Sequence, residues 1–342
     1  MARRAGGGQS GEERLIARHF KPLARSPGAF DLTDDAAVLR HPRGHEMVLT
    51  VDAIVAGVHF FADDPPDAVA RKALRVNLSD LAAKAATPAG FLLTLALPKS
   101  IGDGWLKVFT RALGSDATRF GCPLLGGDTV FTPGPLTISI AAFGTVPIGA
   151  MVRRAGARPG DHVVVTGTIG DAALGLKLKT DPAAARRWRL GAKERRDLIQ
   201  RYLVPEPRNA LAEAIREFAS AAMDVSDGLV GDFDKLCRAS AVAAEIEAEQ
   251  VPLSNGARAA LAADRKLLAN LLTGGDDYEI VATVPPAKIE ALEAAAKAAH
   301  VPLSRIGRRH QGPRCPLCRW PWPQARLRAS LIQPFLTPRP AL

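Results

Sequence analysis

Hydrophobic residues recur along the chain at two different spacings, which distinguish helices from strands. The stretch 67–86 carries small or aliphatic residues every three or four positions, as one face of a helix requires: Ala70, Leu74, Leu78, Leu81 and Ala85. Shorter helices are indicated at 12–20 and 105–121. Runs of aliphatic residues, several of them alternating, instead predict strands over residues 36–40, 46–55, 90–98, 122–129 and 135–146.

The same order of elements begins again after residue 146. Residues 156–178 predict a turn, a strand, a glycine turn and a helix, and later stretches repeat strand and helix signals up to about residue 310. We therefore expect two α+β units, an N-terminal domain over 12–148 and a C-terminal α/β domain over 149–311. Residues 1–11 are rich in glycine and polar groups and are expected to be a disordered tail.

Composition narrows the class of partner. The formal charge is +10, but the basic residues are scattered, and only 5% of residues are aromatic. A nucleic-acid surface needs basic residues on one face with aromatic side chains for stacking, so nucleic acid is disfavoured as a partner. A phosphorylated small molecule would benefit from the same positive field.

Cysteines and apolar stretches bear on the cellular setting. Cys122 and Cys237 stand among apolar residues and are expected to be buried thiols, whereas Cys315 and Cys318 form a lone C-x-x-C. Zinc there is disfavoured because His310 is the only other obvious ligand nearby. The N-terminus has no secretory signal pattern, and the uncharged stretch 135–152 is interrupted by prolines and glycines. We expect a cytoplasmic protein without a membrane partner.

Aspartates stand beside several predicted strands, often next to glycine. Asp52 lies in the strand at 46–55, Asp128 follows two glycines, and Asp224 and Asp227 flank a serine before Gly228. One such aspartate is more often a turn or capping residue, but the recurrence favours ligands. Mg²⁺ prefers carboxylate, water and phosphate oxygens, and glycine lets backbone N–H groups approach phosphate. The pattern predicts Mg²⁺ with a nucleotide, bound without a P-loop or a protein-kinase catalytic loop.

Seven stretches, in this order, resemble thiamine-monophosphate kinase. They are TDDAAVL (33–39), LTVDAIVAGVHF (49–60), KALRVNLSDLAAKAATP (72–88), LLGGDT (124–129), RAGARPGDHVVVTGTIGDAALGL (154–176), MDVSDGL (223–229) and TGGDDYEI (273–280). The resemblance covers about residues 12–310, within a superfamily that includes aminoimidazole ribonucleotide synthetase and selenophosphate synthetase. It implies ATP-dependent phosphorylation of thiamine monophosphate to thiamine diphosphate by direct in-line transfer. It also implies a two-domain synthetase-like fold in a homodimer, whose β-rich N-terminal domains bind ATP and pair into a barrel.

The resemblance also assigns roles to residues. The positions that match Mg²⁺ ligands are Asp35, Thr50, Val51, Asp52, Asp80, Asp128, Asp224 and Asp227, with Val51 able to contribute only its backbone. Those that match ATP contacts are Gly127, Asp128, Arg154 and Ser226, with Arg153 as an alternative to Arg154. His59 and Asp276 match substrate contacts, and no residue is expected to act as a general base, because the acceptor is already an anionic phosphate. Lys84 is expected to be a solvated helix charge.

The chain departs from the family pattern in three places. It has DLTDD where the family has Gly-x-Gly-Asp-Asp, Asp276 where the family has glutamate, and an atypical tail over 312–342 that contains Trp320 and Trp322. Two alternatives therefore stay open. One is another ATP-dependent synthetase of the superfamily, although residues 1–35 lack the reactive cysteine of selenophosphate synthetases. The other is a nucleotide-binding protein with weakened transferase activity.

Overall fold

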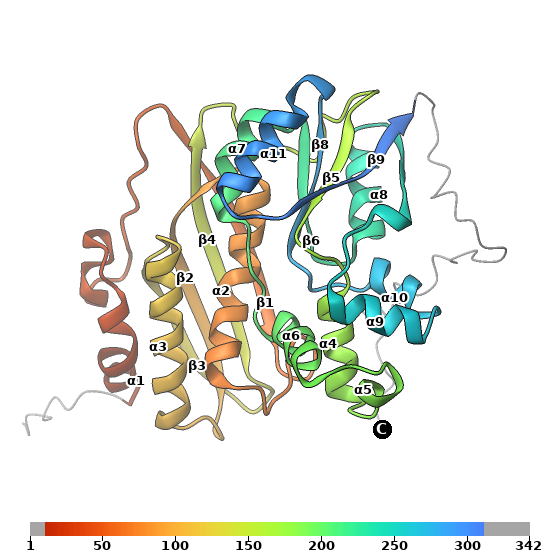
Figure 1. Cartoon of the computed structure of the whole chain (residues 1–342). Coiled ribbons are helices and arrows are strands. Elements are labelled where there is room, and N and C mark those ends of the chain that lie inside the picture. The colour runs from red at the N-terminus through yellow and green to blue at the C-terminus, as the bar shows by residue number, and fades with distance from the viewer. Residues whose placement is uncertain (1–10, 311–342) are drawn as a thin grey trace, which may run out of the picture.

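The computed structural model describes residues 11–310, apart from the side chains of Glu12 and of residues 308–310. The expectations for residues 1–10, for the tail 312–342 and for Cys315 and Cys318 lie outside the described residues. The fold has two parts, each built on its own sheet (Figure 1).

The N-terminal part is a four-stranded sheet in the order β1-β4-β2-β3. Its strands are β1 (His45–Val55), β2 (Thr87–Pro98), β3 (Leu124–Thr132) and β4 (Thr137–Pro147). Only β2 and β3 pair in parallel. Helices α2 (Pro66–Ala83) and α3 (Asp103–Arg119) pack together over one face of this sheet (Figure 1). The strands expected at 46–55, 90–98, 122–129 and 135–146 are thereby confirmed.

The segment before β1 differs from the expectation. It begins with α1 (Gly11–Leu15), a π turn at Ile16–Phe20 and 3₁₀ turns at Lys21–Leu23 and Pro27–Leu32. The strand predicted at 36–40 is wrong, because this stretch pairs with no strand of the sheet. Val38 instead donates its backbone N–H to Gly28 O over 2.8 Å. A run of apolar residues forms a strand only where a neighbouring strand completes its hydrogen bonds.

The C-terminal part is a five-stranded sheet in the order β6-β8-β5-β9-β7. The strands are β5 (His162–Thr166), β6 (Ala221–Val225), β7 (Ala243–Ile246), β8 (Glu279–Val284) and β9 (Leu303–His310). All neighbours run antiparallel, whereas a strict α/β arrangement has a parallel sheet.

Eight helices among the described residues accompany this second sheet. They are α4 (Asp171–Thr180), α5 (Ala184–Arg187), α6 (Ala192–Leu203), α7 (Ala212–Phe218), α8 (Leu229–Ala239), α9 (Asn255–Ala263), α10 (Leu267–Thr273) and α11 (Ile289–Ala298). Short 3₁₀ turns occupy Asn209–Leu211, Ala248–Gln250 and Pro286–Lys288. Figure 1 shows α7 and α11 beside the upper part of the sheet, where they pack against its strands, and α4, α5 and α6 below the sheet.

Helix α2 lies at the boundary between the two parts and is buried almost all round. Leu74, Leu78 and Leu81 pack into the core of the N-terminal sheet. Ala82 and Ala83, at the end of the same helix, pack with Val164 and other residues of the C-terminal core. The periodicity predicted over 67–86 is confirmed, and a helix buried on all sides can carry polar groups only where they find partners.

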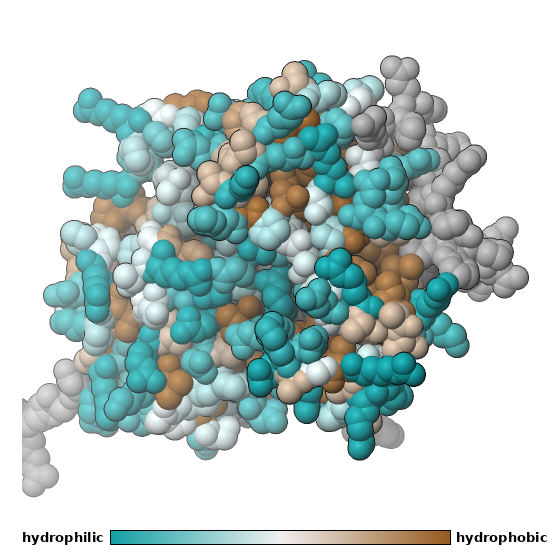
Figure 2. Space-filling view, in the orientation of Figure 1, coloured by the Kyte–Doolittle hydropathy of each residue, from teal (hydrophilic) through white to brown (hydrophobic). Residues whose placement is uncertain are grey.

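The other face of the N-terminal sheet is partly apolar and open. Leu49 and Val51 on β1 are 66% and 65% exposed, and Leu92 on β2 and Val130 on β3 are exposed on the same face. Figure 2 shows the molecule from the side of Figure 1, where polar side chains predominate and hydrophobic ones lie in small groups between them. Cys122 and Cys237 are buried, as expected. Within residues 11–310, no helix is both long and apolar enough to span a bilayer.

Candidate active site

The first part of the site lies where β1 faces α2. Alternation along β1 directs Thr50 and Asp52 toward the helix, while Val51 points to the open face of the sheet and is 65% exposed. Thr50 Oγ1 donates to Asp80 Oδ2 over 2.5 Å, and the Asp52 N–H donates to Asn77 Oδ1 over 3.1 Å. Strand and helix thus hold two of the predicted acids, Asp52 and Asp80, close together.

The strand β6 brings a third acid to the same place. Asp224 is 4% exposed, and its carboxylate accepts a hydrogen bond from Ser79 Oγ over 3.1 Å. Burial, and then the negative charge of Asp80, raises the pKa of Asp224 to about 7. Burial likewise raises the pKa of Asp52 to about 6, with further contributions from Asp80 and Asp227. These carboxylates lie close enough to repel one another, which a bound cation would relieve.

The loop after β6 carries Ser226 and Asp227. Asp227 is 71% exposed, and its Oδ2 pairs with Lys235 Nζ at 2.6 Å. Its N–H donates to the buried Asp232 over 2.8 Å, which fixes the loop at the start of α8. Gly228 has φ of 110°, and a Cβ there would lie 2.5 Å from the backbone of Thr273. The glycine of this motif therefore allows two loops to approach each other.

Lys84 and Arg154 lie beside these acids. Lys84 Nζ donates to the Ala222 carbonyl over 2.7 Å, and burial, with the charge of Arg154, lowers the Lys84 pKa to about 8. Asp224 and Asp80 act in the opposite direction. The expectation of a solvated helix charge at Lys84 is wrong, because the packing of β6 against the end of α2 covers its side chain. Arg154 is exposed.

The residues expected to contact substrate meet at Lys72. Lys72 Nζ donates to the Asp276 carboxylate and to the His59 carbonyl, each over 2.9 Å. The Tyr202 hydroxyl donates to the same carbonyl over 3.3 Å. Burial lowers the pKa of His59, and its Nδ1 accepts the Val55 N–H over 3.1 Å. Sequence reasoning missed Lys72, although α2 offers no solvent-facing side on which a lysine could lie.

The remaining predicted residues lie away from this junction, on β3 and in the segment before β1. Asp35, Gly127 and Asp128 line a cavity of about 870 Å³ together with Asp34 and apolar residues such as Leu49. Asp128 is on β3, and β3 is at the edge of the sheet opposite β1. The single chain therefore divides the predicted metal-binding acids into two groups, one beside β1 and α2 and one beside β3.

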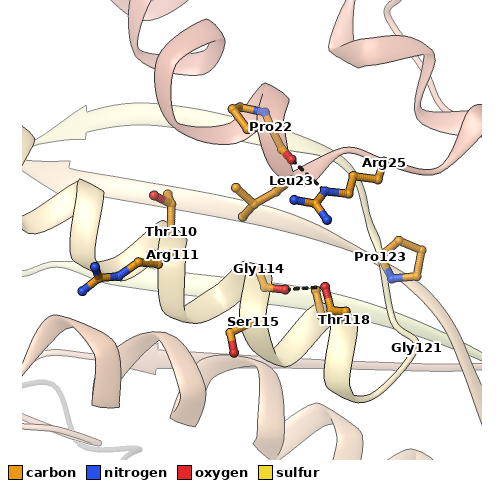
Figure 3. A pocket seen from close by; sticks show the side chains of 11 residues that line it. Pro22, Leu23, Arg25, Thr110, Arg111, Gly114, Ser115, Thr118, Gly121 and Pro123 are labelled. Carbon is orange, nitrogen blue, oxygen red and sulfur yellow. Dashed lines mark hydrogen bonds between the residues drawn. The ribbon is translucent and has the colours of Figure 1, made fainter.

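A second hollow, of about 460 Å³, lies between the segment 22–25 and α3 (Figure 3). Arg25 donates there to the Pro22 carbonyl over 3.3 Å, and Thr118 donates to the Gly114 carbonyl over 2.9 Å. The residues that line it include none of the predicted site residues, and no carboxylate. This hollow is therefore not a candidate for the metal and nucleotide site.

The carboxylates of this site could bind Mg²⁺ through one or two ligands at a time. In the part of the chain that the structure describes, no group of three or more His, Cys, Asp or Glu side chains is placed to hold one metal ion. Mg²⁺ is usually held by one or two carboxylates, with water and phosphate oxygens completing its shell. Burial and the charge of Asp80 raise the pKa of Asp52 and of Asp224, so a cation held between these carboxylates would stabilise their ionised forms, as that mode of binding requires.

Two family models together match most of the chain. The model of the AIR synthase related protein, N-terminal domain, matches residues 33–146, and that of the C-terminal domain matches residues 158–315. Fold and site thus define a two-domain protein of the AIR synthase related class.

Similar proteins, both curated and of known structure, identify a single family within this class. Thiamine-monophosphate kinase of Caulobacter vibrioides is 45% identical over 296 residues, which cover 85% of this chain and 82% of the relative. The crystal structure of thiamine-monophosphate kinase from Stenotrophomonas maltophilia K279a superposes with a TM-score of 0.79 at 36% identity, covering 88% of this chain and 93% of that one. AaThiL complexed with AMPPCP and TMP superposes with a TM-score of 0.72 at 31% identity, covering 82% and 86%. The chain belongs to the thiamine-monophosphate kinase family.

Proposed function

We propose that the chain transfers the γ-phosphoryl group of ATP to thiamine monophosphate and so forms thiamine diphosphate. The observation that carries the proposal is the junction of β1, α2 and β6, where Asp52, Asp80 and Asp224 meet beside the Ser226 loop. Membership of the family supports the same reaction, and a relative has been solved with AMPPCP and TMP together.

Asp52, Asp80, Asp224 and Asp227 would hold Mg²⁺, with Thr50 as a further oxygen donor. Mg²⁺ bound there would neutralise charge that develops on the transferred phosphoryl group. The chain itself holds the acids in place: Ser79 donates to Asp224, Thr50 donates to Asp80, and Asn77 accepts the Asp52 N–H. Such fixed dipoles and charges require little reorganisation during the reaction.

The nucleotide would lie against Ser226 and Arg154, and the substrate against His59 and Asp276. The backbone N–H of Asp276 donates to the Ser226 carbonyl over 2.9 Å, so the nucleotide loop and the substrate loop are joined directly. Because the accepting group is a phosphate that is already anionic, no side chain needs to remove a proton from it. The residues act by positioning two anions in line and by balancing their charge.

The group formed by Asp35, Gly127 and Asp128 would complete the site through a second copy of the chain. The open apolar face of the N-terminal sheet supports a homodimer in which two such sheets close into a barrel. Closing two sheets joins their free edges, and the two groups of acids lie at the β1 and β3 edges. Pairing the β3 edge of one copy with the β1 edge of the other would unite them.

Transfer of phosphate from Mg-ATP to thiamine monophosphate by the purified protein tests this function. Thiamine and an aminoimidazole precursor serve as control acceptors. Formation of thiamine diphosphate only from the monophosphate is the expected result. Binding of Mg-ATP without any product would indicate instead a nucleotide-binding protein, and turnover of the precursor would indicate another synthetase of the superfamily.

A further inference from the structure

Lys72 is a lysine buried between the two parts of the molecule. It projects from α2, which Figure 1 shows between the two sheets, and its side chain is only 2% exposed. Nζ donates to Asp276 Oδ2 and to the His59 carbonyl at 2.9 Å each, and it lies 4.0 Å from the centre of the Tyr202 ring. The ammonium group thus joins an N-terminal loop, an N-terminal helix and two C-terminal segments.

These contacts surround the ammonium group with two hydrogen-bond acceptors and an aromatic ring. A lysine has three donors; two make hydrogen bonds, and the group also faces the electron-rich face of Tyr202, which favours a cation. Burying a charge is unfavourable unless it is paired and hydrogen-bonded, and here both conditions hold. With 2% of its side chain exposed, Lys72 is covered by these contacts and not open to solvent.

Its partner Asp276 is held just as firmly but remains accessible. The Asp276 side chain is 29% exposed, and its backbone takes the left-handed conformation with φ of 72°. Its N–H donates to the Ser226 carbonyl, and its charge, after burial, contributes to raising the pKa of the nearby Tyr278 hydroxyl. Aspartate has a short side chain, so the direction of its carboxylate follows from these few contacts.

We propose that Lys72 is a positioning residue, which sets the direction of the Asp276 carboxylate and the shape of the His59 loop for the phosphorylated substrate. This inference rests on the function proposed above, because it assigns Asp276 and His59 to the acceptor rather than to ATP. Lys72 does not touch the substrate. Its removal leaves Asp276 without its counter-ion and the His59 carbonyl without its charged donor.

A purely structural role would make Lys72 a clamp between the two parts, and the chain offers a matched control for that role. Lys179 on α4 pairs with the buried Asp64 of the N-terminal part at 2.6 Å and lies 4.8 Å from the centre of the Phe61 ring. It is therefore a second lysine that links the two parts through an aspartate and an aromatic ring. None of its contacts described here involves Asp276 or His59.

Steady-state kinetics of Lys72→Met, Asp276→Asn, the double variant and Lys179→Met test the proposal, with thermal unfolding of each as a check on folding. We expect Lys72→Met to raise KM for thiamine monophosphate about tenfold and to change KM for ATP by less than about twofold. The double variant should be no worse than the more affected single variant, because both remove one interaction. Lys179→Met should lower the melting temperature and should not change KM for thiamine monophosphate more than KM for ATP.

Two results would overturn the role of Lys72. One is an equal change of KM for both substrates, as a clamp between the two parts would give. The other is a double variant in which the effects of Lys72→Met and Asp276→Asn on KM for thiamine monophosphate multiply. If Lys72→Met does not fold, Lys72→Gln, which keeps a donor for the His59 carbonyl, replaces it in the same series. The unsubstituted protein is assayed alongside. Absence of thiamine diphosphate there would refute the proposed function itself, whereas normal turnover with unseparated KM values would refute only the role of Lys72.

Discussion

Glu279 offers a sharp test of how the loop that carries Asp276 is held. It begins β8, is fully buried, and accepts four hydrogen bonds with its two carboxylate oxygens. Oε1 accepts from Arg201 at 2.8 Å and from Arg208 at 2.5 Å, and Oε2 accepts from Arg208 Nε and Thr166 Oγ1 at 2.6 Å each. Arg201 also donates to the Asp277 carbonyl over 3.0 Å. The carboxylate therefore fastens the loop to two arginines.

Glu279→Gln keeps the shape of the side chain but removes the charge and one acceptor. The new amide group would face donors that already point at that position. Removing one partner of a buried ion pair costs about 3–5 kcal/mol of unfolding free energy. Arg201 and Arg208 retain 20% and 14% of their side-chain exposure and can regain some water. We therefore expect a loss at the lower end, about 3 kcal/mol, and a melting temperature about 6–12 °C lower.

Thermal unfolding followed by circular dichroism, supported by urea titration, measures this loss. Glu293→Gln is the matched control, because Glu293 makes a bidentate pair with Arg305 at the surface, with 37% and 40% of the two side chains exposed. Such a pair contributes less than about 1 kcal/mol. If Glu279→Gln were no more destabilising than Glu293→Gln, the reasoning about buried charge at this position would be refuted.

Three further predictions follow from the site and the open sheet. Asp224→Asn should lower turnover at least about 100-fold. The metal-free variant should be at least as stable as the unsubstituted protein at pH 8, because the substitution removes a buried charge that Asp80 repels. Turnover and melting temperature measured together check this, and normal activity would contradict the metal assignment. His59→Ala should raise KM for thiamine monophosphate more than KM for ATP, whereas equal effects in the same kinetic assay would indicate packing. Leu49→Asp should shift the protein from dimer to monomer in analytical ultracentrifugation, because Leu49 is 66% exposed on the open face of the sheet that is proposed to pair; an unchanged mass would argue against that face.

Much of the local structure followed from the sequence. The spacing of aliphatic residues over 67–86 predicted α2, and the runs at 46–55 and 135–146 predicted β1 and β4. These predictions succeed because side chains on one face of a helix or strand are fixed by the period of the backbone. The run at 36–40 shows the limit, since a strand also needs a neighbour that the local sequence does not specify.

For the candidate site, too, the sequence predicted some features and left others to the tertiary structure. The acids beside glycines pointed to metal and nucleotide, and family motifs assigned them roles, because short motifs keep their ligands within a few residues. The sequence did not indicate that Lys72 would be buried, nor that it would meet Asp276, which lies 204 residues further along the chain. It also did not indicate that Glu279 would accept from both Arg201 and Arg208.

By itself, then, the sequence indicated most of the segments that become helices and strands and which residues are candidates for the chemistry. Only the tertiary structure decided which charges became partners and how the predicted acids were divided between the β1 and β3 edges of one sheet. The physical reason is that backbone periodicity acts over a few residues, whereas the stability of a buried charge depends on whatever group the fold brings within about 3 Å.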